Sequence, residues 1–451
     1  MKKWDTRGFM FTNTALVVLF IPLIIEQFLN ILVGLLDSLM IAHVGEAAVS
    51  GVSLVDSCFN LLIMLFFAVA TGGAVVAGQY LGRKDKENAS RAANQNVWFM
   101  LFVSLVVMGC VYLGQNLILN GIFGQIEPDV EGYARTYLLI VSASIPFLAL
   151  YSAAAALFRS MGNSKTPMKI SMLMNFINFG GNALCIFGLH MGSEGVAIPT
   201  LCSRVVSAVV LLCLLKNPNL KVHLPKKLTF HWDGNLIKSI LIVALPNGIE
   251  NSMFHVGKIA VLSLVSSFGT YAIAANAVAN TMSSFQVLAG SAAQLAIVAV
   301  VSQCLGAGEH EQAKYYTIKI HKMTYLGMLL FNAVIWGLMP LILHWYDLSE
   351  QATHAALIIL IMHGVSSILV WPTSFVMPCI FRASGDGKYS MTAAIITMFA
   401  VRVFMSYVFG ALLGFGVIGV WMATVLDECA RSVLYVARFR SGKWLQKKVI
   451  S

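Results

Sequence analysis

The sequence predicts an all-α integral membrane protein with twelve transmembrane helices in two related lobes of six helices. Three observations support this fold class. Of the 451 residues, 58% are hydrophobic and only 11% are charged, whereas a typical soluble domain has about 25% charged residues. Apolar runs of about 20 residues or more, which is the length that crosses a bilayer, recur along almost the whole chain. The second half of the chain also matches the first at a nearly constant shift.

The predicted helices follow one another with short polar connections. They cover residues 14–43, 50–80, 94–123, 134–158, 168–189, 195–215, 239–267, 271–302, 322–345, 354–381, 390–413 and 416–436. The first run follows the basic residues Lys2, Lys3 and Arg7, as the apolar part of a signal peptide does. It is too long for such a segment and has no small-residue cleavage site, so we keep it as a helix.

Basic residues gather in alternate connections between the predicted helices. They include Lys2, Lys3, Arg7, Arg83, Lys84, Lys86, Arg91, Arg159, Lys165, Lys169, Lys216, Lys238, Lys314, Lys322, Arg382, Lys388, Arg438 and Lys448. Cytoplasmic loops carry such an excess, so we expect a multi-pass protein of the cell membrane (inner or plasma membrane) with both termini cytoplasmic. The net charge of +10 is explained by these loops, and we expect no nucleic acid partner.

The two halves of the sequence repeat each other at a shift of 223 or 224 positions. The matched pairs are Pro22 with Pro246, Glu26 with Glu250, Gly45 with Gly269, Phe158 with Phe381, Arg159 with Arg382, Gly162 with Gly385, Lys165 with Lys388, and Thr200 with Thr424. A shift of six helices keeps both halves in the same orientation, which predicts parallel repeats with the substrate path between them. We therefore expect an N-lobe at 1–216, a cytoplasmic linker at 217–238 and a C-lobe at 239–451.

The first predicted helix carries two acids, which are costly inside a bilayer. Glu26 and Asp37 are eleven residues apart, which places them within about 20° of one helix face. Asn30 lies close to the same stripe and Gly34 at its margin. This face must point inward. Either the acids serve a site, or they only bond neighbouring helices; the symmetry mate Glu250 favours the second reading for Glu26 more than for Asp37.

The fifth and sixth predicted helices offer neutral partners for a carboxylate. Asn175, Asn178 and Asn182 recur at one helix face, and Thr200 is on the next helix. Amides and hydroxyls can hydrogen-bond both the ionised and the protonated carboxyl. Such a stripe of asparagines can also serve only to pack helices together.

In the second half, the seventh predicted helix carries most of the polar residues. They are Asn247, Glu250, Asn251, His255 and Lys258. Five further charged residues lie toward predicted helix ends, and we interpret them as structural. These are Arg204, Arg402, Asp427, Glu428 and Arg431.

The sequence contains none of the motifs of the common enzyme classes that we sought. There is no H-E-x-x-H, G-x-S-x-G or Walker loop, and the eight cysteines lie in apolar stretches without a C-x-x-C pair. We expect no disulfide, no metal site and no cofactor. Active transport by such a chain would have to draw on an ion gradient.

Several segments together resemble the multidrug and toxic compound extrusion (MATE) family. They are Leu36-Asp37-Ser38-Leu39-Met40-Ile41, Gly78-Gln79-Tyr80-Leu81-Gly82 with its copy at 302–308, Phe158-Arg159-Ser160-Met161-Gly162, Gly419-Val420-Trp421, and the segment 438–444. The resemblance covers essentially the whole chain in order. It implies a V-shaped transporter of two six-helix lobes that exports varied, often cationic or amphipathic compounds by antiport against H⁺ or Na⁺.

The resemblance also implies where the ions and substrates bind. The coupling acid of the family falls on Asp37, with Asn178, Asn182 and Thr200 beside it. We assign Glu26, Asn30, Gly34, Asn175, Glu250, Asn251, His255 and Lys258 to the substrate cavity. Many relatives have an aspartate where this chain has Asn182, and one branch has C-lobe acids where this chain has Phe254 and Trp371. These departures favour H⁺ over Na⁺.

Two other functions remain open at this point. One is a flippase for a lipid-linked precursor, whose pyrophosphate would favour several cations in the cavity, of which Lys258 and Arg402 are candidates. The other is a membrane-embedded enzyme acting on isoprenoids, against which the absence of paired metal-binding carboxylates argues. In every case we expect small-molecule or lipid partners and a chain that functions as a monomer.

Overall fold

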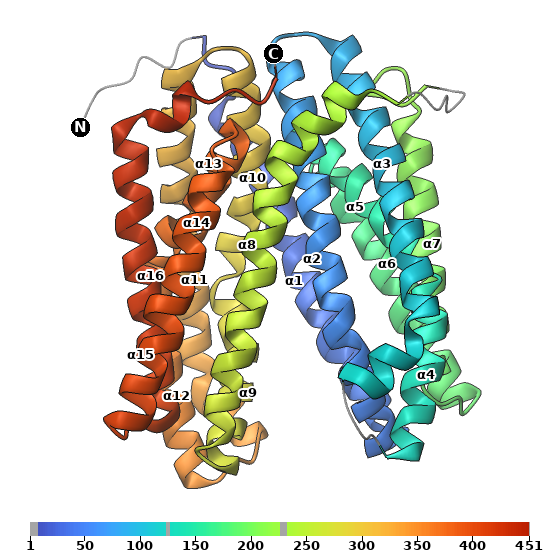
Figure 1. Ribbon diagram of the computed structural model, residues 1–451, viewed down its shortest axis with the longest axis vertical. Coiled ribbons are helices and arrows are strands. Elements are labelled where there is room, and N and C mark those ends of the chain that lie inside the picture. The colour runs from blue at the N-terminus through green and yellow to red at the C-terminus, as the bar shows by residue number, and fades with distance from the viewer. Residues whose placement is uncertain (1–7, 123–126, 226–231, 451) are drawn as a thin grey trace. The chain divides into compact units, whose positions relative to one another are not determined.

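The computed structural model of the chain describes residues 8–122, 127–225 and 232–450, and in these residues the regular elements are all helices (Figure 1). Part of the predicted linker 217–238 and the basic residues Lys2, Lys3 and Arg7 therefore lie outside the described residues. In the described part of the chain, nine helices are long and apolar enough to cross a membrane, and a bent pair makes a tenth.

Each of the twelve predicted ranges is occupied by helix. The first seven correspond to α1 (Asn13–Ala42), α2 (Glu46–Gly82), α3 (Lys86–Leu113) with η1 (Leu117–Ile122), α4 (Pro128–Ser142) with α5 (Ile145–Ser160), α6 (Lys165–Ala183) with η2 (Leu184–Gly188), α7 (Glu194–Leu215) and α8 (Gly234–Ser266). The last five correspond to α9 (Thr270–Gln286) with α10 (Leu288–Gly306), α11 (His310–Trp345), α12 (Glu350–Leu369) with η3 (Pro372–Val376) and α13 (Met377–Ser384), α14 (Gly387–Thr397) continued by η4 (Met398–Val403), α15 (Phe404–Ser406) and η5 (Tyr407–Leu412), and α16 (Gly416–Ser441).

Two features of these helices differ from the prediction. Several predicted helices are broken, and the pair α4 and α5 is bent by 49°. The helix α11 begins at His310 rather than near residue 322, because its first turns are polar and a hydropathy pattern detects only the apolar part. The long helices α8 and α16 are not among the nine apolar spans, and polar and charged residues interrupt both.

The chain forms two compact units. One, which we call the N unit, consists of Ile21–Ala244; the other, the C unit, consists of Leu245–Ser451 together with the residues up to Phe20. The unit boundaries thus fall inside α1 and α8, shortly before Pro22 and Pro246, which occupy matching positions of the repeat. The predicted division into 1–216, 217–238 and 239–451 stays a prediction.

The helices pack in the same pattern within each unit. In the N unit, α2 packs against α3, α4 and α5, and α7 packs against α4, α5 and α6. In the C unit, α10 packs against α11 and α13, α9 packs against α12, and α16 packs against α12, α13 and α14. In the repeat, α9 and α10 together correspond to α2. Each of the N-unit contacts named here therefore has a counterpart in the C unit, as expected for repeats.

A repeated glycine ends one helix in each unit. Gly162 follows α5 with φ 82°, and Gly385 follows α13 with φ 85°. This left-handed backbone conformation costs a residue with a side chain about 1 kcal/mol or more, and glycine is the usual residue there. The repeated sequence Phe-Arg-x-x-Gly therefore marks the same helix end twice.

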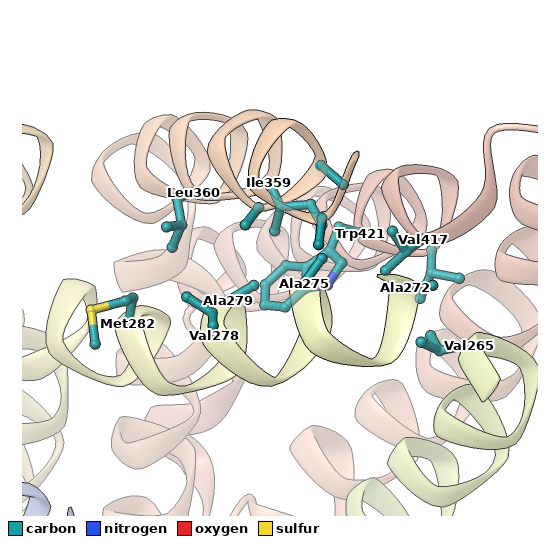
Figure 2. Close-up of a cluster of buried hydrophobic side chains, with 14 of the residues drawn as sticks. Val265, Ala272, Ala275, Val278, Ala279, Met282, Ile359, Leu360, Val417 and Trp421 are labelled. Atoms are coloured by element: carbon teal, nitrogen blue, oxygen red, sulfur yellow. The ribbon is translucent and has the colours of Figure 1, made fainter. Parts of the chain in front are cut away.

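Figure 2 shows the buried apolar cluster of the C unit, where α9 contacts α12 and α16. The helix α9 contributes mainly small side chains, such as Ala272, Ala275 and Ala279, to this cluster. Small residues let helices approach closely, which is the usual basis of helix packing in a membrane. Trp421 of α16 fills the space that they leave, and its Nε1 donates to Asn276 Oδ1 at 3.1 Å.

Candidate functional site

The four residues predicted to couple an ion lie together in the N unit. Asn182 Nδ2 donates to Asp37 Oδ1 at 2.7 Å and approaches Asn178 Oδ1 at 3.4 Å. Asn178 Nδ2 in turn donates to Thr200 Oγ1 at 3.0 Å. The carboxyl group of Asp37 therefore begins a hydrogen-bonded chain that joins α1, α6 and α7.

The packing of α6 against α7 holds this chain in place. Asn175, Asn178 and Asn182 are all buried on one face of α6. On the same helix, a Cβ atom at Gly181 would lie 2.6 Å from Pro199 Cβ, so only glycine allows α7 to approach this closely. Thr200 directly follows that proline, which brings its hydroxyl within reach of Asn178.

Three residues that the sequence analysis did not assign to a site surround the same carboxyl group. Tyr137 Oη of α4 donates to Asp56 Oδ1 of α2 at 3.0 Å. Arg204 Nη1 of α7 donates to Ser144 Oγ at 2.7 Å. The charges of Asp56 and Arg204 both act on Asp37. The site therefore contains two carboxyl groups and one guanidinium.

A simple signal could have found Asp56. It is an acid inside the second predicted helix, and an acid in such a helix needs a partner or a function. Arg204 was interpreted as a structural residue near a helix end, but it lies in the middle of α7 and its charge acts on Asp37, the predicted coupling acid. Tyr137 carries no signal in the sequence that would separate it from the other aromatic residues.

Two other acids of the predicted cavity form ion pairs within their own units. Arg159 Nη2 contacts Glu26 Oε1 in the N unit. Arg382 Nη2 donates to Glu250 Oε1 at 2.8 Å in the C unit, and Ser390 Oγ donates to the second oxygen of Glu250 at 3.2 Å. The repeated glutamate and the repeated arginine of the sequence are therefore partners of each other.

The remaining predicted cavity residues are divided between the units. In the N unit, Ser171 Oγ approaches Asn30 Oδ1 at 3.4 Å, a Cβ atom at Gly34 would meet open space, and Asn175 is buried. In the C unit, Asn251 Nδ2 donates to Asn247 Oδ1 at 3.3 Å, and His255 is half-buried. Their role in binding substrate stays a prediction.

The C unit contains a cavity of about 450 Å³. Of the predicted cavity residues in this unit, Lys258 lines it, together with Arg402, His363 and Glu428. The prediction that Arg402 and Glu428 are structural residues near helix ends was wrong in its premise: Glu428 lies in the middle of α16, and Arg402 lies in the π-helical turn η4. Both residues also lie well inside the predicted ranges 390–413 and 416–436, so these ranges did not support their placement near helix ends.

Aromatic rings form much of the cavity wall. Phe254, Trp371, Phe375 and Trp421 all line it, and the rings of Trp371 and Phe375 stack with centroids 4.8 Å apart. A Cβ atom at Gly290 of α10 would lie 2.1 Å from the indole of Trp371, so glycine at this position makes room for the ring.

Three cations surround one of these rings. Lys258 Nζ, Arg402 Cζ and Arg431 Cζ lie 5.5, 5.1 and 5.3 Å from the centroid of Phe254. Asp427 pairs with Arg431 at 2.9 Å and with Arg402 at 3.4 Å. Glu428 accepts a hydrogen bond from Ser366 Oγ. The region around this ring thus holds three cations and two carboxyl groups.

Two repeated units of membrane-spanning helices, with a polar chain in one and a cavity in the other, define a multi-pass membrane transporter. The family model MatE matches residues 22–184 and 246–408. The chain therefore belongs to the MatE family, the multidrug and toxic compound extrusion transporters, and is not an enzyme. The two matched ranges begin 224 positions apart (246 − 22), which is the shift of the sequence repeat.

Full-length relatives and a solved structure agree with this family. The chain is 26% identical to the "Uncharacterized transporter YisQ" of Bacillus subtilis, over 94% of each chain. It is 24% identical to the "Probable multidrug resistance protein NorM" of Thermotoga maritima, over 97% of this chain and 94% of that protein. A solved structure described as MATE in the straight conformation has the same fold, with a TM-score of 0.88 over 96% of this chain and 97% of that chain at 19% identity.

Proposed function

We propose that this transporter is a secondary antiporter that exports amphipathic compounds in exchange for protons, with Asp37 as the coupling acid. The observation that supports this most directly is the hydrogen-bonded chain from Asp37 through Asn182 and Asn178 to Thr200. Each of these partners can bond the carboxyl group or a neighbour in either protonation state. The Asn182 amide can offer its NH₂ group to the ionised carboxylate or its oxygen to the protonated carboxyl, so Asp37 can gain and lose a proton and still keep a hydrogen bond to Asn182.

The charges around Asp37 favour a proton over a sodium ion. A sodium ion that loses its water needs several oxygen ligands and compensating negative charge. Asn182 instead directs its NH₂ group at Asp37, and the positive charge of Arg204 already acts on this carboxyl group. Asp56 is the second acid that acts on it, but Tyr137 bonds to one of its oxygens.

The mechanism that follows is alternating access. In the outward-open state Asp37 takes up a proton, its negative charge disappears, and the polar face of α1 becomes less costly to bury. The N-unit helices then repack and bound substrate leaves. In the inward-open state the proton is released and new substrate binds. A potential of 100 mV adds about 2.3 kcal/mol for each charge that moves across the membrane.

The alternation of basic and non-basic connections supports a cell-membrane location with both termini in the cytoplasm. Tags at the two ends should therefore be protected from an impermeant label added to whole cells. We propose that a single chain carries out transport, because both the polar chain and the cavity are built from one chain.

The expectation of cationic substrates came from the family resemblance, and free acids in the cavity would support it. Glu26 and Glu250 are instead paired with Arg159 and Arg382. Lys258 and Arg402 line one cavity, and this observation favours the second candidate function, a flippase for a lipid with an anionic headgroup. The antiporter would carry dissolved compounds across the membrane, whereas the flippase would carry only lipids.

The test of the proposed function is the variant Asp37→Asn in lipid vesicles. We expect the variant to fold and insert, because the amide is nearly isosteric, but to lose export of ethidium and of naphthalene-2-sulfonate driven by a pH gradient. The matched control is Asp129→Asn, the same change at an exposed acid of the N unit, which should transport as the wild type does. Uphill export by the purified Asp37→Asn variant would show that Asp37 is not the coupling residue.

A further inference from the structure

The cavity of the C unit has the dimensions of a ligand-binding site. Its volume of about 450 Å³ lies within the range of roughly 300–1,000 Å³ that is typical of small-molecule pockets. Residues of α8, α9, α12 and α16 and of the π-helical segments η3 and η4 line it. All of these residues belong to the C unit, so the cavity is complete within that unit.

Lys258 is the charged residue of the cavity without a counter-ion. Among the described residues no carboxylate lies within ion-pair distance of its Nζ, and its nearest aromatic contact is the ring of Phe254 at 5.5 Å. The other intramembrane charges nearby each have a partner: Asp427 forms ion pairs with Arg402 at 3.4 Å and with Arg431 at 2.9 Å, and Glu428 accepts a hydrogen bond from Ser366.

An ammonium group at membrane depth that lacks a counter-ion costs free energy. A ligand that brings a negative charge to Lys258 offsets that cost. A cationic ligand would instead meet repulsion from Lys258 and Arg402, while the acid that lines the cavity, Glu428, is already held by a hydroxyl group and lies beside cations.

The rest of the wall suits an apolar, ring-shaped body. Trp371 stacks on Phe375 at 4.8 Å, and Trp421 adds a third ring system. Such walls bind aromatic groups by offset stacking or edge contacts. Asn280 and Ser283 of α9 add neutral hydrogen-bonding groups to the lining.

We propose that this cavity binds an amphipathic anion, with one carboxylate, sulfonate or phosphate group against Lys258 and its apolar body among Trp371, Phe375 and Trp421. One unpaired cation suits one anionic group rather than a pyrophosphate. The inference deepens the proposed function by naming a substrate class. It rests on the proposed function only in stating that the bound anion is also transported. Binding itself requires no gradient and no proton at Asp37.

The test is equilibrium binding by isothermal titration calorimetry to the whole chain in phosphatidylcholine nanodiscs, with empty nanodiscs as the blank. Three probes share one ring system and differ in charge: naphthalene-2-sulfonate, 2-naphthylmethanol and 2-naphthylmethylammonium. We expect the sulfonate to bind at least about tenfold more tightly than the other two, since charge-assisted hydrogen bonds are the strong ones.

Variants of Lys258 test whether its positive charge causes the tighter binding of the sulfonate. Lys258→Met should lower sulfonate affinity to that of the alcohol and leave the alcohol unchanged, which also shows that the cavity is intact. Lys258→Arg should keep the preference. The matched control, Lys388→Met, removes the same charge from an exposed position of the C unit and should bind as the wild type does.

Two outcomes overturn the proposal: wild-type affinities that are equal for the three probes or highest for the ammonium, or a sulfonate preference that persists in Lys258→Met. Asp37→Asn should bind the sulfonate normally, so a failure of proton coupling is distinguishable from a failure of anion binding. Competition between soluble dihexanoylphosphatidate and 1-naphthyl phosphate identifies the source of the anion. Tighter binding of the first assigns the cavity to a lipid headgroup, and tighter binding of the second assigns it to a dissolved compound.

Discussion

At the scale of single residues, the two buried glutamate–arginine pairs connect the repeat to stability. Glu250 and Arg382 are each about a tenth exposed at the side chain, and their atoms lie 2.8 Å apart; Glu26 and Arg159 form the corresponding pair. Removal of one partner of a buried pair leaves an uncompensated charge, which typically costs about 3–5 kcal/mol. Removal of both partners costs much less.

We therefore expect Glu250→Gln to lower the free energy of unfolding of the detergent-solubilised protein by about 3 kcal/mol, because the change leaves Arg382 buried and unpaired. The double variant Glu250→Gln with Arg382→Gln should recover most of this loss. The measurement is the fraction that stays monodisperse after heating. If the single variant is as stable as the wild type, the ion pair does not stabilise the fold, and a role of Glu250 in substrate binding explains the residue better.

An exposed pair provides the control for this experiment. Arg91 and Glu87 form an i,i+4 ion pair with most of both side chains in solvent. Because such surface pairs contribute about 0–1 kcal/mol, Glu87→Gln should change stability little. A loss as large as that of Glu250→Gln would mean that the assay does not report burial.

The candidate coupling site could be predicted in part from single residues. Asp37, Asn178, Asn182 and Thr200 were found because the acid is costly in lipid and the amides recur at helical spacing. Arg204 was taken for a residue near a helix end, where a cation usually extends to the membrane surface. It lies instead in the middle of α7 and donates to Ser144, at the break between α4 and α5, a contact between distant parts of the chain that the local sequence does not show.

At the scale of helices, the start of α3 is the best-defined connection. Asp85, in the polar connection Arg83–Lys86 between α2 and α3, is the N-cap residue, and its Oδ1 accepts from the backbone N of Asn88 at 3.0 Å. This hydrogen bond and one from the Asn88 side chain lower the pKa of Asp85 below its usual value. The ionised form is therefore the one that the folded state stabilises.

We expect Asp85→Ala to lower stability near neutral pH by about 1 kcal/mol, the usual cost of losing an N-cap. Since the pKa is lowered on folding, this contribution is present above the unfolded pKa and disappears as the pH falls through the folded pKa. Asp85→Asn keeps an acceptor without the charge and should lose less. Thermal unfolding in detergent at several pH values measures both; an Asp85→Ala variant as stable as the wild type would contradict the assignment.

The breaks within helices were the part of the secondary structure that the sequence could not predict. The predicted helix at 271–302 consists of α9 and α10, which meet at Val287, and the one at 354–381 is interrupted by η3. Hydropathy is continuous across both breaks. The π-helical turn η4, which includes Arg402, is likewise a property of packing.

At the scale of the whole molecule, the repeat predicted the two-unit organisation and the matching packing, because duplicated sequences keep the same core contacts. It did not predict that the unit boundaries fall within α1 and α8. That division depends on which helices each half of α1 and α8 contacts, and the local sequence does not encode this. The units also differ in charge: two acids face one guanidinium around Asp37, while three cations surround Phe254.

This difference supports the proposal that ion coupling takes place in the N unit, and it leads to a prediction for the transporter as a whole. Wild-type vesicles should export substrate on a pH gradient with sodium absent. Asn182→Asp adds a third carboxylate to the site, where the Asn182 amide now lies 2.7 Å from Asp37. With Asn178 and Thr200 next to it, the variant offers the oxygen ligands and the negative charge that a dehydrated sodium ion needs. Asn182→Asp should therefore gain a response to a sodium gradient.

The measurement is export of ethidium and naphthalene-2-sulfonate from vesicles between mildly acidic and mildly alkaline pH, with and without a sodium gradient. The matched control is Asn175→Asp, a change on the same buried face of α6 at a residue that does not bond to Asp37. It should stay insensitive to sodium, because its carboxylate cannot share an ion with Asp37. Wild-type export that requires sodium and ignores the pH gradient would overturn proton coupling. A sodium response in Asn175→Asp equal to that of Asn182→Asp would show that added charge alone, rather than charge beside Asp37, selects the ion.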